Sequence, residues 1–208
     1  MSDILDLLVI LTPEHLPTLR RRCPRCDTET VHRCAERFRV NGNGRRLDVW
    51  LLYLCDGCGR TWKRTVHTRA RPEALGADLV AFERNDPAAV ARVAFDPAGV
   101  PLDPVPFQVR GPEDLPVAPF RLRLRMDPPF PLRLDQALCR VLDLSRSALV
   151  KAVDRGIIDP GGRRALRRPA AEAGAIRVDG AALSARPCAP GSAPEAARPA
   201  GSSRSGPA

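Results

Sequence analysis

The chain has 208 residues, of which 44% are hydrophobic but only 4% aromatic. This length fits one domain of ordinary size or two small ones, and the scarcity of rings excludes a core built mainly on aromatic side chains. The formal charge of +9 favours a polyanionic partner such as nucleic acid. Fourteen Arg and Lys against five Asp and Glu lie between Arg20 and Arg71, so this segment alone carries a charge equal to the whole excess.

The N-terminal residues predict neither a membrane anchor nor a signal peptide. The apolar run from Ile4 to Leu11 is broken by Asp6 and is far shorter than the roughly 20 residues that a membrane helix needs. It also lacks the basic flank of a signal peptide. We therefore expect a cytoplasmic protein without membrane contact, whose seven cysteines bind metal or remain free thiols rather than form disulfides.

The first third of the chain predicts a β-rich unit. An apolar stretch at residues 9–11 predicts a strand. The asparagines and glycines of 41–44 predict a hairpin turn between strands at 38–40 and 47–54, because they tolerate the positive φ angles of a tight reversal. Residues 61–67, rich in Thr, Val and Trp, predict a further strand.

The middle of the chain predicts two helices and a Pro-rich connection. Apolar residues recur at helical spacing within a predicted helix at 73–84. Asp86 and Pro87 predict the N-cap and first residue of a second helix that ends near Phe95. Arginine alternates with apolar residues over 120–126, which predicts a half-exposed strand with its arginines outward.

The C-terminal part predicts two helices and two short strands. Asp135 is expected to cap the first helix and Ser145 the second. A short strand at 157–158, a turn at 159–162 and a strand at 174–178 follow.

Four cysteines form two Cys-x-x-Cys pairs, Cys23 with Cys26 and Cys55 with Cys58, on either side of 28 residues that contain the predicted hairpin. Zn²⁺ takes four tetrahedral ligands, and two thiolates on one tight turn can occupy two of the four positions. The spacing predicts a Zn²⁺ site. With four protein sulfurs the site is structural, because no position remains for water or substrate.

Other interpretations of the cysteines and histidines stay open at this point. The pairs can instead be two redox pairs, a set of disulfides, or buried thiols. His32 and His67 are possible substitute ligands, although four cysteines already complete the coordination. Three further cysteines have no partner at ligand spacing and are expected to be free thiols: Cys34, Cys139 and Cys188.

These elements predict an α+β fold made of two modules. We expect an antiparallel zinc ribbon over 1–71 and a helical, Pro-rich connector over 72–131. A module of two helices and a small sheet follows over 132–180. Residues 185–208 are mainly Pro, Ala, Gly and Ser with scattered Arg, and predict a disordered tail.

A row of polar and basic residues marks one face of the second C-terminal helix. Ser147, Lys151 and Arg155 lie at i, i+4 and i+8, with Arg146 beside them. Such a row suits the phosphates of RNA. The candidate RNA-binding residues are Arg133, Arg146, Ser147, Lys151, Arg155, Arg163 and Arg164. The alternative is a two-helix packing unit with solvated arginines.

Two resemblances bear on these modules. The order Arg-Leu-Asp, helix, Leu-Ser-Arg-Ser, helix, Gly-Ile-Ile, turn and strand resembles the RNA-binding domain named after the fourth protein of the small ribosomal subunit, here called the S-four-type domain. This resemblance implies docking on structured RNA. The family's Val-Asn-Gly turn is replaced by Asp-Pro-Gly-Gly, and its Gly-Asp by Gly174-Ala175.

The chain as a whole resembles a bacterial family classed as a domain of unknown function, numbered 1062. The residues that carry this resemblance are Arg-Cys-Pro-Arg-Cys, Phe-Arg-Val-Asn-Gly-Asn-Gly, Leu-Asp-Val-Trp-Leu and Cys-Asp-Gly-Cys. It extends from the N-terminus to about Val178 and implies no activity.

The sequence therefore predicts a non-enzymatic, zinc-binding RNA-binding protein, either ribosome-associated or bound to another structured RNA. The alternative is a regulatory adaptor whose ribbon presents Trp50, Tyr53 or Trp62 to a protein partner. Catalysis is not expected, because residues 72–131 contain no histidine, no phosphate-binding glycine loop and no pairing of nucleophile and base.

Overall fold

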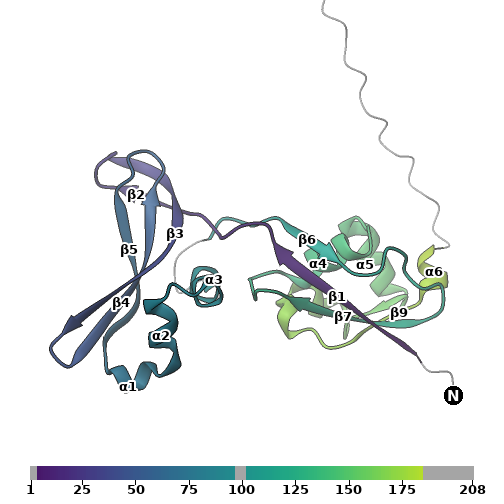
Figure 1. Cartoon of the computed structure of the whole chain (residues 1–208). Coiled ribbons are helices and arrows are strands. Elements are labelled where there is room, and N and C mark those ends of the chain that lie inside the picture. The colour runs from purple at the N-terminus through teal and green to yellow at the C-terminus, as the bar shows by residue number, and fades with distance from the viewer. Residues whose placement is uncertain (1–3, 97–101, 185–208) are drawn as a thin grey trace, which may run out of the picture.

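The computed structural model describes residues 4–96 and 102–184. Its elements form a mixed α+β fold with two sheets, each covered by helices (Figure 1). One sheet has four strands and the other five. The predicted disordered tail, residues 185–208, lies outside the described residues.

The four-stranded sheet is an antiparallel meander, in the order β2-β3-β4-β5. Its strands are β2 (Leu19–Cys23), β3 (Thr28–Asn43), β4 (Arg46–Cys55) and β5 (Thr61–Ala70). The predicted hairpin is confirmed: β3 and β4 pair from Asn43 and Arg46 onward, and Gly44 supplies a positive φ of 62°. The strands are longer than predicted, because polar residues such as Arg33 lie on the exposed side of a half-buried strand.

Three short helices pack on this sheet. They are α1 (Pro72–Leu75), α2 (Ala77–Glu83) and α3 (Pro87–Phe95). The single helix predicted at 73–84 is wrong, because Gly76 adopts a φ of 52° and separates α1 from α2. The predicted cap of α3 is confirmed: the Asp86 carboxylate accepts a hydrogen bond from the Ala89 amide at 2.9 Å.

The second sheet has the strand order β6-β1-β7-β9-β8. Its strands are β1 (Leu5–Pro13), β6 (Phe107–Arg110), β7 (Phe120–Met126), β8 (Ile158–Asp159) and β9 (Ile176–Val178). β1 is parallel to β7 and antiparallel to β6. The N-terminal strand, which we had grouped with the cysteines, therefore belongs to the other sheet, because Val9 and Leu11 are buried in its core.

Helices cover one face of this second sheet. They are α4 (Leu134–Val141), α5 (Arg146–Asp154) and α6 (Gly180–Ser184), with the short 3-10 helices η1 (Arg163–Arg167) and η2 (Ala170–Glu172). Ser145 caps α5 as predicted, accepting from the Ala148 amide at 3.2 Å. The predicted cap of α4 is wrong: Arg133 occupies the cap position and Asp135 lies in the first turn.

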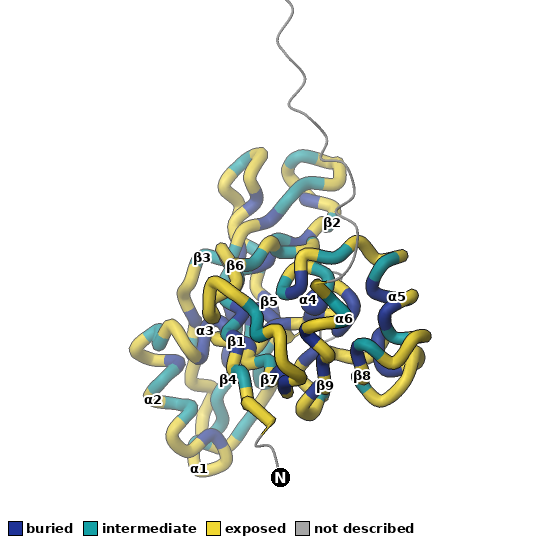
Figure 2. Tube along the Cα trace, turned by 90° about the vertical axis from the view of Figure 1, so that its right-hand side faces the viewer, coloured by how far each residue is buried: buried dark blue, intermediate teal, exposed yellow. Residues whose placement is uncertain are grey.

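The two sheets build separate hydrophobic cores that meet at α3. Phe95 packs in the core of the five-stranded sheet, whereas Val90 and Ala94 pack in that of the four-stranded sheet. The buried Arg64 guanidinium of β5 donates to the carbonyls of Ala94 and Asp96 at the end of this helix. Figure 2 shows buried stretches of β1, β7 and β9 beside α4 and α5. None of the helices within the described residues is long and apolar enough to cross a membrane.

Candidate functional site

The four paired cysteines lie on two turns at the same end of the four-stranded sheet. Cys23 ends β2 and Cys55 ends β4. Because β3 and β4 pair with His32 opposite Cys55, the turn after β2 and the turn after β4 come together. The Asp56 amide donates to the Val31 carbonyl at 3.0 Å and fastens the second turn to β3.

The two turns have the same backbone design. The Asp27 amide donates to the Cys23 carbonyl at 2.9 Å, and the Gly59 amide donates to the Cys55 carbonyl at 2.8 Å. The donor residue has a positive φ in both turns, 54° for Asp27 and 69° for Gly59. Glycine adopts this conformation freely, while Asp tolerates it, and here the Asp27 carboxylate also accepts from Arg22 at 2.6 Å.

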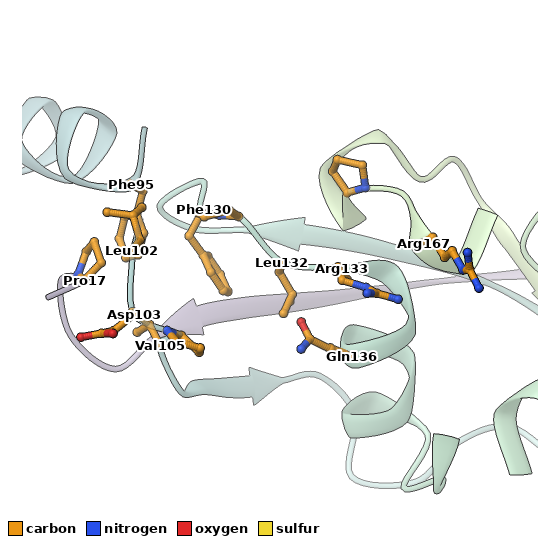
Figure 3. A pocket seen from close by; sticks show the side chains of 13 residues that line it. Pro17, Phe95, Leu102, Asp103, Val105, Phe130, Leu132, Arg133, Gln136 and Arg167 are labelled. Carbon is orange, nitrogen blue, oxygen red and sulfur yellow. The ribbon is translucent and has the colours of Figure 1, made fainter. Parts of the chain in front are cut away.

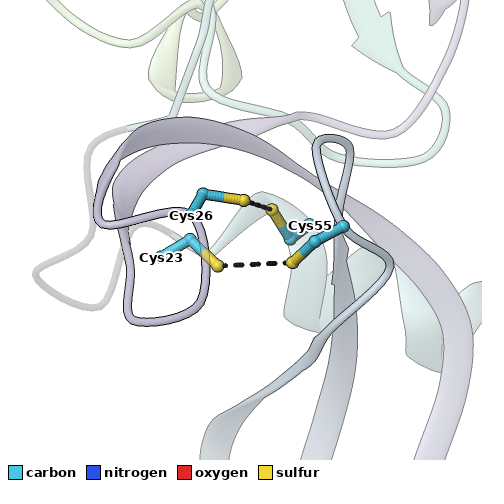
Figure 4. Close-up of side chains that lie close together, drawn as sticks. Cys23, Cys26 and Cys55 are labelled. Carbon is cyan, nitrogen blue, oxygen red and sulfur yellow. Dashed lines mark hydrogen bonds between the residues drawn. The ribbon is translucent and has the colours of Figure 1, made fainter.

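The sulfurs have the spacing of a tetrahedral metal site (Figure 4). Cys23 Sγ and Cys58 Sγ are 3.6 Å apart, Cys26 Sγ and Cys55 Sγ are 3.8 Å apart, and all four lie within 4.8 Å of one another. These separations exclude disulfides, whose sulfurs are about 2.05 Å apart. Four sulfurs at about 2.3 Å from a central ion would be about 3.8 Å apart. The four cysteines can therefore hold a metal ion.

The surroundings of the sulfurs favour the thiolate at Cys55. The Thr30 hydroxyl, 3.2 Å from Cys55 Sγ, contributes most to lowering the pKa of Cys55 to about 6, and the amides of Cys58 and Gly57 add to it against the effect of burial. The Cys58 thiol and then burial raise the pKa of Cys26 to about 12. Thiolates are the form that binds metal, and crowded sulfurs lose their protons together when a cation joins them.

Gly57 lies between the second pair of cysteines and close to the first pair. A Cβ at Gly57 would lie 3.1 Å from Cys26 Sγ, closer than ordinary van der Waals contact. A larger residue would require Cys26 Sγ to shift by a few tenths of an ångström. The residues present thus fit a four-sulfur metal site.

The other candidate ligands lie outside this group. His32 is buried, and its Nδ1 lies 3.2 Å from the Thr30 carbonyl. His67 packs its ring against Phe82 at 5.8 Å. Cys34 and Cys139 are free and separate from the four-cysteine group, as expected. Cys188 lies outside the described residues.

Four of the seven predicted RNA-binding residues surround one hollow of about 650 Å³ beside α5 and η1. The four are Arg146, Ser147, Lys151 and Arg163. Arg167, which the sequence analysis omitted, adds a further guanidinium to the hollow. The sequence does contain a signal for it, because Arg167 lies only four residues after Arg163 in the same Arg-rich segment.

The remaining three predicted residues lie elsewhere. Arg155 follows the last residue of α5 and does not line the hollow, because the helix ends before it can complete the row. Arg164 is exposed on η1 and also does not line it. Arg133 lies beside the hollow and is paired with Asp135.

Asp135 is a buried carboxylate that positions two arginines, a role the sequence analysis did not predict. It accepts from Arg133 Nε at 3.1 Å and from an Arg133 terminal nitrogen at 2.8 Å. A terminal nitrogen of Arg146 lies 3.3 Å from the same carboxylate. Only 7% of the Asp135 side chain is exposed, so this negative charge is held beneath the basic hollow by its two partners.

The comparisons with known proteins give one match. Residues 40–161, more than half of the chain, match the family model described as "Protein of unknown function (DUF1062)". The match includes Cys55 and Cys58 but begins after Cys23 and Cys26, and it ends within the C-terminal module. Comparison with curated proteins and comparison with solved structures each found no match.

Proposed function

The chain belongs to this family, and because the family's description assigns no activity, we propose from the residues that it is a zinc-binding, non-enzymatic RNA-binding protein. The observation that carries the proposal is the basic hollow beside α5 and η1. Four cationic side chains around a concave surface suit a phosphate backbone better than a small neutral ligand.

Zinc is the proposed ion for the four-cysteine group. Four thiolate ligands at tetrahedral spacing are typical of structural Zn²⁺, and the two turns on adjoining β-hairpins are typical of a zinc ribbon. The cysteines would hold the ion and the ion would supply folding free energy. No open coordination position remains for chemistry, which supports an architectural role.

The hollow has the chemistry of a phosphate site. Lys151 and Arg163 are exposed, and Arg163 has a distant counterion, Asp154, at 3.8 Å. Arg167 makes no ion pair with another described residue. These side chains can exchange water and counterions for phosphate oxygens, so RNA binding should weaken steeply as salt rises.

The arrangement of helices and strands supports an S-four-type module. α4 and α5 pack together against β7, β8 and β9, and the hollow opens between α5 and η1. Among the residues that the structure describes, no aromatic ring lines the hollow. Contact through the shape and phosphates of folded RNA is therefore the proposed mode.

Charge reversal in the hollow tests the proposal. The double variant Lys151→Glu, Arg163→Glu should lose binding to a mixed-sequence RNA hairpin. Each reversal should reduce the magnitude of the negative slope of log K against log salt by about 1 or more. Arg164→Glu is the matched control for the single variant Arg163→Glu, because it makes the same change on η1 outside the hollow. Equal loss in the control would mean that binding follows net charge and not this site.

The RNA itself is identified by crosslinking in cells and sequencing. Absence of RNA above background, with a stoichiometric protein partner recovered after nuclease treatment, would contradict RNA binding and favour the adaptor. The adaptor would present the half-buried rings of Trp50 and Trp62. The Lys63 ammonium lies 5.3 Å from the centre of the Trp50 ring, and the Arg21 guanidinium lies 4.5 Å from the centre of the Trp62 ring.

A further inference from the structure

Arginines gather on the side of the five-stranded sheet that faces away from its helices. The apolar residues of β7 pack in the core beneath the helices, so the residues that alternate with them lie on the other side. Residues of the neighbouring strands that lie opposite these arginines in register, or in the same cross-strand row, share this side. The residues of this surface, here called the arginine face, are Arg110 of β6, Arg121, Arg123 and Arg125 of β7, and Arg177 of β9, and all five are exposed.

The strand register brings these arginines close together. Arg121 lies directly opposite Arg177. Ile10 of β1 lies between Arg125 on one neighbouring strand and Arg110 on the other. Because alternate residues of a strand are about 6.6 Å apart, the three arginines of β7 follow one another at that interval. The result is a regular set of guanidiniums on a sheet surface.

This concentration of charge does not favour folding by itself. Like charges directly opposite each other on neighbouring strands destabilise a sheet, and Arg121 and Arg177 are such a pair. Neither makes an ion pair with another described residue. Asp159 is also opposite Arg177, but its carboxylate accepts from the Gly161 amide at 3.0 Å. Residues that oppose folding in this way are typical of functional surfaces.

The acidic residues near the arginine face leave its guanidiniums accessible. Asp6 lies 3.8 Å from Arg123, and roughly half of each side chain is exposed. Asp127 lies 3.6 Å from Arg125, and this pair is exposed to a similar extent. Exposed ion pairs of this kind are weak. A phosphate can therefore replace either carboxylate, because a guanidinium binds phosphate through two parallel hydrogen bonds.

The helix side of the same module has a different character. It contains the basic hollow and an apolar cavity of about 470 Å³, which is lined by residues of α3, α4 and η1. The Phe130 ring projects into this cavity, 5.7 Å from the Phe95 ring (Figure 3). The Asp103 carboxylate in its wall accepts from the Thr18 hydroxyl at 2.7 Å. The cavity does not suit an anion, so the hollow and the arginine face are the two places where an anionic chain can bind.

We propose that the arginine face binds a second segment of the RNA that lies on the hollow, an inference that rests on the proposed function. Regularly spaced guanidiniums complement the regularly spaced phosphates of a nucleic-acid backbone. The face repels a second copy of itself and also residues 185–208, which contain three Arg and one Glu.

The composition of the face also favours RNA over an anionic membrane. Surfaces that bind membranes usually insert aromatic side chains such as Trp or Phe. The two aromatic residues in the strands of this sheet, Phe107 and Phe120, both pack in the core on the helix side. The described strands therefore present no aromatic ring on the arginine face.

The two surfaces act in order. A concave basic surface concentrates the field of its charges, so the hollow makes the first contact with RNA. A segment joined to the bound one then reaches the arginine face at a high effective concentration. The arginine face thus adds affinity only for an RNA that is long enough to reach both sides of the module.

The test compares one RNA hairpin with two copies of it joined by a single-stranded linker of about 40 Å, roughly twice the thickness of a helix layer and a sheet. The joined hairpins should bind the metal-loaded, full-length chain about tenfold or more tightly than the single hairpin. Arg121→Gln, Arg177→Gln should abolish this gain with little change for the single hairpin. It should also reduce the magnitude of the salt slope for the joined hairpins by about 2.

Two controls separate binding from folding and from net charge. The melting temperature of Arg121→Gln, Arg177→Gln should stay the same or rise, because the two like charges are removed. Arg37→Gln, Arg39→Gln removes two exposed arginines from β3, in the other sheet, and should keep the gain. Equal loss of the gain in this second variant would mean that net charge causes it, and would overturn the inference.

The remaining outcomes distinguish this inference from the proposed function. If Lys151→Glu, Arg163→Glu loses hairpin binding but Arg121→Gln, Arg177→Gln keeps the gain, or no gain exists, the hollow binds RNA and the arginine face does not. If phosphatidylserine vesicles bind the chain through Arg121 and Arg177 while the joined hairpins show no gain, the face binds lipid and the inference is wrong. If neither RNA binds, both the inference and the proposed function are overturned.

Discussion

The two sheets of this protein are stabilised in different ways. The core of the five-stranded sheet contains about twice as many buried hydrophobic residues as that of the four-stranded sheet. The four-stranded sheet has the four-cysteine group at its end, while the five-stranded sheet has no such group among the residues described. A small core usually needs additional stabilisation from a disulfide or a bound metal, and here the four cysteines provide the ligands for a metal.

The candidate metal site and the candidate RNA-binding surface lie in different regions of the molecule. The candidate metal ligands lie on two turns of the four-stranded sheet, whereas the hollow is built on α4, α5 and η1, over the five-stranded sheet. Folding of one region and binding by the other should thus respond to different changes. Within the described residues, α3 is the one helix with buried residues in both cores, and Leu16 also packs against both.

Metal removal should have the largest effect and should act on one region. Both tryptophans and the only tyrosine lie in the four-stranded sheet, so Trp fluorescence reports that region alone. A chelator should unfold it, since structural Zn²⁺ contributes about 10–16 kcal/mol. Amide hydrogen exchange of α5 peptides should change little. Cys55→Ser should match the chelator, and metal analysis should find less than one Zn²⁺ per chain.

Cys139→Ser is the matched control for this prediction. Cys139 is a free, half-buried cysteine on α4, away from the four-cysteine group. The variant should keep its Zn²⁺ and its Trp spectrum. A Trp spectrum that survives complete removal of metal would contradict a metal-dependent four-stranded sheet.

Asp135→Asn should destabilise the other region by a smaller amount. The substitution removes the charge that accepts from Arg133 and pairs with Arg146, and both guanidiniums are solvent-exposed enough to be rehydrated in part. We expect a loss of about 1–3 kcal/mol, measured as faster hydrogen exchange in α4 and α5 with an unchanged Trp transition. Asp154→Asn breaks an exposed pair and should cost no more than about 1 kcal/mol.

If Asp135→Asn destabilises the Trp transition as much as it destabilises α4 and α5, the two sheets are not stabilised independently. This result would mean that the two cores unfold as one unit through α3. Equal effects of the Asp135 and Asp154 substitutions would instead remove the case for Asp135 as a positioning residue.

Features that depend on neighbouring residues were predictable from the sequence. The cysteine pairs, the turn at Gly44 and the caps Asp86 and Ser145 each involve residues only a few positions apart. Their chemistry is local, so residue type and spacing are sufficient to predict it. The same holds for the alternating strand β7, whose arginines lie on the exposed face.

Features that depend on distant contacts were not predictable. The strand at Leu5–Pro13 pairs in parallel with Phe120–Met126, and nothing near either strand specifies that partner. Asp135 looked like a cap because Asp is common there, but burial beneath Arg146 determines its role. The cavity combines α3 with the start of α4, so no single segment of the sequence indicates it.

The smallest predicted effects come from two helix caps whose helices contact different cores. Ser145→Ala and Asp86→Ala each remove one side-chain hydrogen bond to a helix amide, worth about 1 kcal/mol. Ser145 caps α5, which packs in the five-stranded sheet's core alone, so its loss should speed hydrogen exchange in α5 without moving the Trp transition. Asp86 caps α3, which packs in both cores, so its loss should be detected by both measurements. If Asp86→Ala changes the Trp transition alone, α3 belongs energetically to the four-stranded sheet, and the two regions are independent despite their shared helix.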